Sequence, residues 1–225
     1  MKTKGNLIVI DGTDGSGKHT QTELLGTNLR ALGCTVETIS FPQYGKKSAG
    51  PTENYLNGLY GSAAEIDAYQ ASVLYAVDRF DASFQIRQWI AEGKIVITDR
   101  YVSANMGHQA GKIQNLSERD HYLAWIEHFE YEIMNIPRPD INIFLYVDPE
   151  LARSLALQVG KVNMDKTKDI HENSAEHMRN ASNAFKYVAT KYGWITIDCT
   201  HSTQMKSREE IASEITKIVQ QKLKL

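Results

Sequence analysis

The first residues that could do chemistry lie in the stretch DGTDGSGKHT at residues 11–20. It matches the pattern G-x-x-x-x-G-K, with Gly12, Gly17 and Lys18 at the fixed positions. A loop of this kind turns several backbone N–H groups toward one point, and its lysine reaches the β- and γ-phosphates of a nucleotide. We therefore expect a nucleotide-phosphate site formed by Gly12, Asp14, Gly15, Ser16, Gly17, Lys18, His19 and Thr20.

The loop departs from the strict pattern directly after the lysine. A hydroxyl residue that helps to hold magnesium belongs there, but the chain has His19, and Thr20 follows one residue late. Mg²⁺ commonly keeps several waters and takes few protein ligands. The change therefore weakens the prediction of a metal contact more than the prediction of phosphate binding. A tight turn with a solvated Lys18 is the alternative.

The hydrophobic pattern predicts strands that alternate with helices. The segment at residues 6–12 is apolar, β-branched and ends at a glycine, which is typical of a buried parallel strand. Such alternation predicts a mostly parallel sheet with ligands at the carboxyl ends of its strands. Further strands are expected at 34–41, 94–99, 141–147 and 194–199, and helices at 17–33, 65–92, 103–109, 118–134, 149–158, 173–192 and 208–223.

Length and charge limit the class of protein. The 225 residues suit one α/β domain spanning 1–225, and a net charge of −2 gives no overall attraction to nucleic acid or to an anionic membrane. The apolar run at residues 7–10 is too short for a signal peptide or a membrane span. We expect a cytoplasmic protein in which Cys34 and Cys199 are reduced.

Three features together resemble the thymidylate kinase family: Asp14 inside the loop, the triplet DRY at 99–101, and Tyr75 followed four residues later by Arg79. The resemblance runs from about residue 5 to the last strand. It implies an α/β, three-layer P-loop kinase fold with an approximately five-stranded parallel sheet and a short lid at about 159–172. It also implies phosphoryl transfer from ATP, with Mg²⁺, to dTMP.

The resemblance assigns the acceptor base to one helix. Tyr75 and Arg79 lie one helical turn apart and so share a face. In the family the aromatic residue stacks on thymine and the arginine donates to a base carbonyl, while the loop carboxylate, here Asp14, positions the phosphate-binding arginine. The alternative is a core tyrosine and a surface arginine paired with Asp78 or Asp81.

The end of the third strand should hold the acceptor phosphate. By resemblance, Asp99 lies beside magnesium and Arg100 clamps the phosphate, for which a guanidinium fork is well shaped. A surface Asp–Arg pair is the alternative. Asn105 is expected at the base edge, and His108 stands where the family usually has a tyrosine beside the 2′ side of the sugar. The deoxyribose preference therefore stays open.

The stretch FPQYG at 41–45 resembles a family loop in which the third residue is usually arginine, here Gln43. We expect Tyr44 to reach the acceptor phosphate. Lys46 and Lys47 either add positive charge there or lie on a mobile loop.

The lid expected at 159–172 contains no arginine. Its cations are Lys161, Lys166 and Lys168. Phosphoryl transfer depends on positioning and on neutralising charge, and lysine lacks the planar fork of arginine. We expect Lys168 to act with Lys18, Asp99 and Arg100 on the reacting phosphates. Candidate metal ligands are Thr20, Asp99 and Glu172.

Two alternatives remain beside a dTMP kinase. One is a kinase of another nucleoside monophosphate, and the other is a catalytically weak, nucleotide-sensing protein of the same fold. The resemblance also implies a homodimer, with the helices at 65–92 or 118–134 as candidate contacts.

Overall fold

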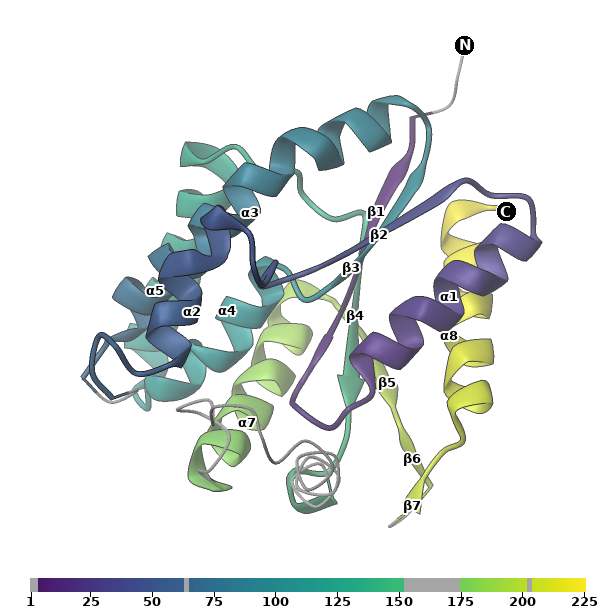
Figure 1. Ribbon diagram of the computed structural model, residues 1–225. Coiled ribbons are helices and arrows are strands. Elements are labelled where there is room, and N and C mark those ends of the chain that lie inside the picture. The colour runs from purple at the N-terminus through teal and green to yellow at the C-terminus, as the bar shows by residue number, and fades with distance from the viewer. Residues whose placement is uncertain (1–3, 63–64, 152–174, 202–203) are drawn as a thin grey trace.

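A computed structural model describes residues 4–62, 65–151, 175–201 and 204–225. One parallel sheet of five strands forms its centre, in the order β2-β3-β1-β4-β5 (Figure 1). The predicted α/β fold is confirmed. The strands are β1 (Asn6–Gly12), β2 (Val36–Ser40), β3 (Ile95–Asp99), β4 (Ile141–Tyr146) and β5 (Ile195–Asp198).

Helices cover both faces of the sheet. Figure 1 shows α1 and α8 on one side and α3, α4, α5 and α7 on the other. The helices are α1 (Lys18–Ala31), α2 (Gly50–Leu56), α3 (Ala68–Ala91), α4 (Val102–His108), α5 (Leu116–Glu127), α7 (Ala175–Tyr192) and α8 (Arg208–Leu223). Shorter elements are η1 (Lys47–Ala49), η2 (Ala110–Lys112), the π-helical η3 (His128–Ile133) and an antiparallel hairpin of β6 (Thr200–His201) and β7 (Gln204–Met205). Among the described residues, no helix has both the length and the apolar character that a membrane crossing requires.

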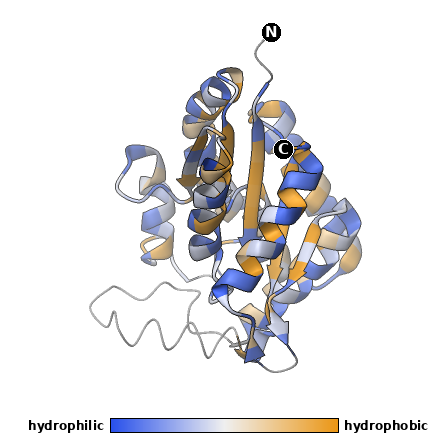
Figure 2. Cartoon of the chain, turned by 90° about the vertical axis from the view of Figure 1, so that its right-hand side faces the viewer, coloured by the Kyte–Doolittle hydropathy of each residue, from blue (hydrophilic) through white to orange (hydrophobic). Residues whose placement is uncertain are grey.

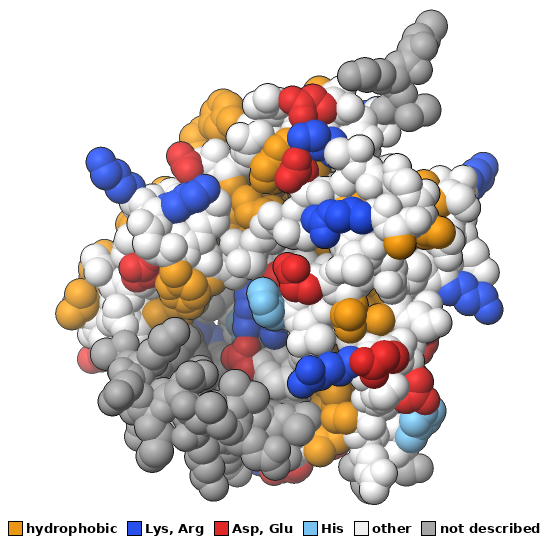
Figure 3. Space-filling model, turned by 45° about the vertical axis from the view of Figure 1, so that its right-hand side comes forward, with side chains coloured by type: hydrophobic (Ala, Val, Ile, Leu, Met, Phe, Trp, Pro, Cys, Tyr) orange, Lys and Arg blue, Asp and Glu red, His pale blue; other side chains and the backbone are white. Residues whose placement is uncertain are grey.

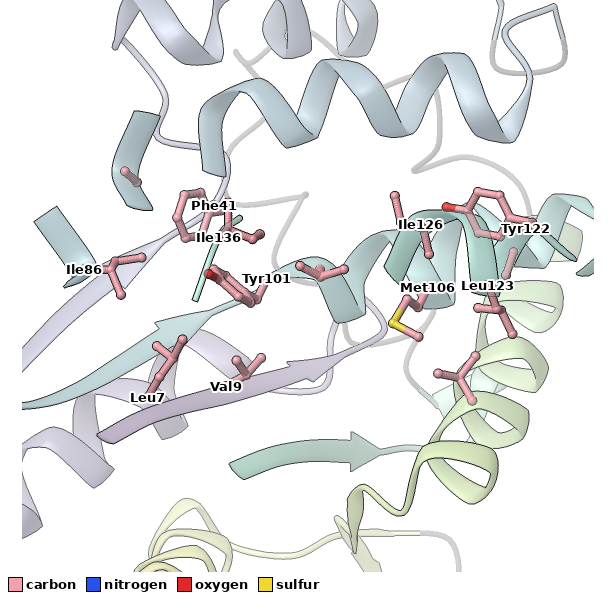
Figure 4. Packing of buried hydrophobic residues seen from close by; sticks show 14 of the residues in the cluster. Leu7, Val9, Phe41, Ile86, Tyr101, Met106, Tyr122, Leu123, Ile126 and Ile136 are labelled. Atoms are coloured by element: carbon pink, nitrogen blue, oxygen red, sulfur yellow. The ribbon is translucent and has the colours of Figure 1, made fainter. Parts of the chain in front are cut away.

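Strand β1 supplies both hydrophobic cores because successive side chains point to opposite faces. Leu7 and Val9 join the core under α3, α4 and α5, whereas Ile8 and Ile10 join the core under α1 and α8. Figure 4 shows Leu7 and Val9 on the side of β1 that faces Tyr101. In Figure 2 the central strand is orange and the helices beside it alternate between blue and orange, as amphipathic helices do.

Local signals explain where the long helices begin. The Asp67 side chain accepts from the backbone N–H of Gln70, and the Gln70 side chain accepts from the backbone N–H of Asp67. This capping box starts α3. Ser207 and Glu210 form the same motif at the start of α8.

Because the five strands are parallel, their carboxyl ends all lie at one edge of the sheet, at the bottom of Figure 1.

Two segments differ from the sequence prediction. The predicted loop at 42–51 runs into η1 and α2, where Pro51 occupies the first turn and Thr52 Oγ1 donates to Leu74 O at 3.0 Å. The predicted helix at 118–134 is α-helical only to Glu127 and continues as a π-helical turn. In both segments, tertiary contacts override the structure that the local sequence pattern predicts. The expected lid at 159–172, with Lys168 and Glu172, lies outside the described residues.

A close approach of α4 to α7 depends on Gly107. A Cβ atom at this position would lie 2.3 Å from two ring atoms of Phe185. Phe185 is fully buried and stacks on Phe144 of the sheet at 5.2 Å, so a shift of its ring would disturb this packing.

We predict that Gly107→Ala lowers the free energy of unfolding by about 1–3 kcal/mol, because overpacking forces side chains off their rotamers. Chemical denaturation measures the change. Gly50→Ala is the matched control, since its backbone is right-handed helical and no atom lies within 4 Å of the added methyl group. Equal stability of the two variants would contradict this account of the α4–α7 contact.

Candidate active site

The site begins where β1 and β3 end side by side. Ile10 of β1 is in register with Asp99 of β3, and Arg100 N–H donates to Ile10 O at 3.0 Å. Arg100 has a φ of 67°, in the left-handed region that costs a residue with a side chain roughly 1 kcal/mol. Strain of this kind is found preferentially at functional sites.

The glycine-rich loop follows β1 and leads into α1. Gly15 and Gly17 have φ values of 82° and 84°, which favour glycine. A Cβ atom on Gly17 would meet nothing within 4 Å, whereas one on Gly12 would lie 2.6 Å from Leu145 O of β4. The loop is therefore packed against the sheet at its start and open at its end, where the N-terminus of α1 begins with Lys18.

Lys18 is buried against this loop. Its Nζ donates to Thr13 O at 2.9 Å and lies 3.6 Å from Asp14 Oδ1. Burial, together with the nearby charge of Arg100, lowers the pKa of Lys18 below its ordinary value. The ammonium group is thus held close to the loop backbone, where an anion would relieve its desolvation.

Arg100 joins the loop to the end of α4. Its Nη2 donates to Asp14 Oδ1, and its Nη1 lies 2.8 Å from Nε2 of His108. Arginine only donates, so Nε2 of His108 accepts and the proton of a neutral ring is on Nδ1. Burial alone would raise the pKa of Asp14, but the charges of Arg100 and Lys18 outweigh it and hold the pKa below its usual range.

A pocket opens beside Arg100, between the loop after β2, helix α3 and helix α4. All seven residues predicted for the acceptor contribute to its wall. The lining is Asp14, Phe41, Pro42, Tyr44, Leu56, Tyr75, Arg79, Arg100, Ala104, Asn105, His108 and Gln109.

Arg79 is the most buried charge in this wall, with 1% of its side chain exposed. Its Nε and Nη2 donate to the two carboxylate oxygens of Glu130, both at 2.6 Å. The surface pairing with Asp78 or Asp81 considered above is therefore wrong. Asp78 instead accepts from Gln43 N, Gln43 Nε2 and Ser48 Oγ at 2.7–3.0 Å.

The Asp78 carboxylate holds the loop after β2. Lys46 Nζ donates to the Gln43 side chain at 2.6 Å, so both ends of the Gln43 amide are engaged. Tyr44, which is 66% exposed, lies next to it in the pocket wall. The side chain that replaces the expected arginine thus orders this loop.

Asp99 has the chemistry of a metal ligand. Its Oδ1 is buried without a hydrogen-bond partner, and its Oδ2 lies 3.6 Å from Nδ1 of His19. The neighbouring Asp11 is already satisfied, because Gly12 N–H and Ser103 Oγ donate to it at 2.8 and 2.7 Å.

An unpaired carboxylate oxygen suits Mg²⁺, which prefers oxygen and few protein ligands. Thr20 lies half-buried in the first turn of α1. Across the described ranges, no three carboxylate, histidine or cysteine side chains gather into a metal cluster.

Sequence reasoning missed three side chains of this region. Asp11 lies next to the last residue of β1 and directly precedes Gly12 of the glycine-rich loop, so its position was a usable signal. The contacts of Glu130 with Arg79 and of Asp78 with Gln43 had no local signal, because the partners are 51 and 35 residues apart. Only the packing of α3 against its neighbours reveals them.

Comparisons with known proteins agree with this geometry. The family model described as thymidylate kinase matches residues 10–211. A thymidylate kinase of Mycobacterium tuberculosis is 31% identical over 189 residues, covering 84% of this chain and 87% of that protein. One of Schizosaccharomyces pombe is 27% identical, covering 97% and 93%.

A solved structure shares the fold. The thymidylate kinase of Candida albicans superposes with a TM-score of 0.71 at 20% identity, covering 97% of this chain and 92% of that one. The chain belongs to the thymidylate kinase family.

Proposed function

We propose that the glycine-rich loop binds ATP, that the pocket beside it binds dTMP, and that the chain transfers a phosphoryl group between them to give ADP and dTDP. One observation carries the proposal. The contact from Arg100 to Asp14 links the phosphate loop directly to the pocket that contains Tyr75 and Arg79.

On the donor side, the loop amides and Lys18 bind the ATP phosphates. The open side of Gly17 and the N-terminus of α1 support this role, because a helix N-terminus favours anions. The remaining loop residues Gly12, Asp14, Gly15, Ser16, His19 and Thr20 complete the site in this proposal. Lys168 is proposed as the cation that closes over the phosphates.

On the acceptor side, Arg100 binds the phosphate of dTMP with help from Tyr44. Tyr75 stacks on the base, an interaction worth about 1–3 kcal/mol. Arg79 and Asn105 face the edge of the base, and His108 lies beside the sugar. This assignment is supported by their shared place in one pocket wall.

The charges around the loop favour a metal. Lys18 and Arg100 face three carboxylates, those of Asp11, Asp14 and Asp99. Phosphates entering this cluster are repelled by the carboxylates unless a cation offsets them. Mg²⁺ supplies that charge when bound with ATP, and Asp99 would hold it, with Thr20 and Glu172 as further candidates.

No strong general base is required. The dTMP phosphate is largely ionised at neutral pH, so its oxygen attacks in line once it is positioned. Nothing in the described pocket favours a different acceptor nucleotide or a sensing protein without activity. The family match and the presence of all seven predicted acceptor residues in one pocket wall support the kinase.

We propose a homodimer that forms through α3. Its outer side carries an apolar stripe at helical spacing, with side chains 38–61% exposed: Tyr69, Val73, Val77, Phe80 and Phe84. An exposed stripe of this size marks an interaction surface, and a twofold axis lets the same stripe cover itself.

The remaining partners and the compartment are proposals too. The net charge of −2 supports the absence of nucleic-acid binding, and on the face shown in Figure 3 the visible basic and acidic side chains are interspersed. Cys34 and Cys199 are both free, which supports a cytoplasmic location.

We predict that ADP release from ATP and Mg²⁺ is at least ten times faster with dTMP than with dCMP, dGMP, AMP or CMP, measured as kcat/KM. Lys18→Met should lower kcat with dTMP at least a hundredfold, because the charge on the transferred group is no longer neutralised. Lys222→Met is the control, since it lies at the far end of α8. Turnover that prefers another acceptor would overturn the assignment of dTMP, and unchanged turnover in Lys18→Met would overturn the loop assignment.

We also predict that Phe84→Glu converts a dimer into a monomer in sedimentation velocity experiments. A twofold axis through α3 places two glutamates against an apolar surface, which is costly. Leu59→Glu is the control because Leu59 is 70% exposed and lies outside the stripe. A wild-type protein that sediments as a monomer, or a Phe84→Glu variant that stays dimeric, would contradict the α3 interface.

A further inference from the structure

We propose that Glu130 fixes the hydrogen-bond polarity of the base pocket and thereby makes the enzyme prefer thymine over a cytosine-type base. Glu130 does not line the pocket; it acts as a positioning residue through Arg79 and Asn105. The inference rests on the proposed function, because it assigns a role in choosing the acceptor base.

Glu130 is fully buried and uses both carboxylate oxygens. Oε2 accepts from Arg79 Nε at 2.6 Å. Oε1 accepts from Arg79 Nη2 at 2.6 Å and from Asn105 Nδ2 at 3.2 Å. One side chain from the π-helical turn η3 therefore holds a residue of α3 and a residue of α4 at the same time.

The effect on Asn105 is to set the direction of its amide. Its Nδ2 donates to Ser72 O and to Glu130 Oε1, both at 3.2 Å. Both partners only accept, so a flipped amide would point its oxygen at two other oxygens. Oδ1 is therefore the atom that Asn105 offers to the pocket, and it is an acceptor.

The effect on Arg79 is complementary. The bidentate contact with Glu130 uses Nε and Nη2, so Nη1 is the end of the guanidinium that remains for a ligand. Arginine has no acceptor, and the tight pairing holds its plane in one orientation. The pocket wall thus presents one fixed donor from Arg79 and one fixed acceptor from Asn105.

This pattern matches one kind of pyrimidine edge. Thymine carries an acceptor at O4 beside a donor at N3–H, whereas cytosine carries an amino donor beside an acceptor at N3. A cytosine-type base in the same place opposes donor to donor and acceptor to acceptor. Mismatched buried polar groups discriminate strongly, because each one loses its hydrogen bonds to water without replacement.

The test compares dTMP with 5-methyl-dCMP, which has the same shape but the opposite polarity at positions 3 and 4. In Glu130→Gln the new amide offers N–H to one of its partners, so Asn105 can turn and Arg79 loses a bond. We expect the ratio of kcat/KM for dTMP to that for 5-methyl-dCMP to fall at least tenfold, with the KM for ATP unchanged. Glu132→Gln is the control, since Glu132 is on the same turn but pairs with Arg138 at the surface. It should keep the wild-type ratio.

A double-mutant cycle separates positioning from general damage. If Glu130 acts through Asn105, then Glu130→Gln should change the ratio much less in an Asn105→Ala background than alone. Additive losses would overturn the action through Asn105, and an equal loss of kcat/KM for both nucleotides would overturn the whole proposal.

Removing a buried charge can prevent folding, so Glu130→Asp is measured in parallel. It keeps the negative charge beside Arg79 but is too short to reach both partners, and we expect its ratio to fall at least threefold. A wild-type ratio in Glu130→Asp overturns the proposal. If the wild-type enzyme phosphorylates neither nucleotide, the proposed function itself fails; if it prefers dTMP and every variant at Glu130 keeps that preference, only this inference fails.

Discussion

The ion pair between Asp14 and Arg100 is the interaction on which the site depends. It connects the loop after β1 with the residue after β3, and the register of these strands brings the two within reach. Arg100 adopts a left-handed backbone at this point, and its other guanidinium nitrogen contacts His108 of α4. The phosphate loop and the acceptor pocket are therefore two sides of one charged cluster.

This cluster is organised for a ligand more than for stability. Burial disfavours the charged form of Lys18 and lowers its pKa, while nearby carboxylates raise the pKa of Arg100 against the same effect. Asp99 keeps a buried oxygen without a partner. Desolvated charges that are incompletely paired cost free energy in the folded protein. Phosphates and a divalent cation would supply the missing partners.

The parts that could be predicted from sequence are those set by short spacing. Gly12, Gly17 and Lys18 define the loop, and Tyr75 with Arg79 defines one face of α3, because a helix repeats every 3.6 residues. Glu130 could not be predicted, since it meets Arg79 across 51 residues through a π-helical turn that no local pattern indicated. Helix α2 was not predicted for a similar reason. Its segment is rich in turn residues, and contacts with α3 stabilise it as a helix.

The most direct test of the central claim is calorimetric binding of dTMP and of thymidine to the wild-type protein and to Arg100→Met. The two ligands differ only in the phosphate that Arg100 is proposed to bind. The account predicts that Arg100→Met weakens dTMP binding at least tenfold and changes thymidine binding less than twofold. An equal loss for both ligands, or unchanged binding of dTMP, would contradict the claim that Arg100 joins the loop to the acceptor phosphate.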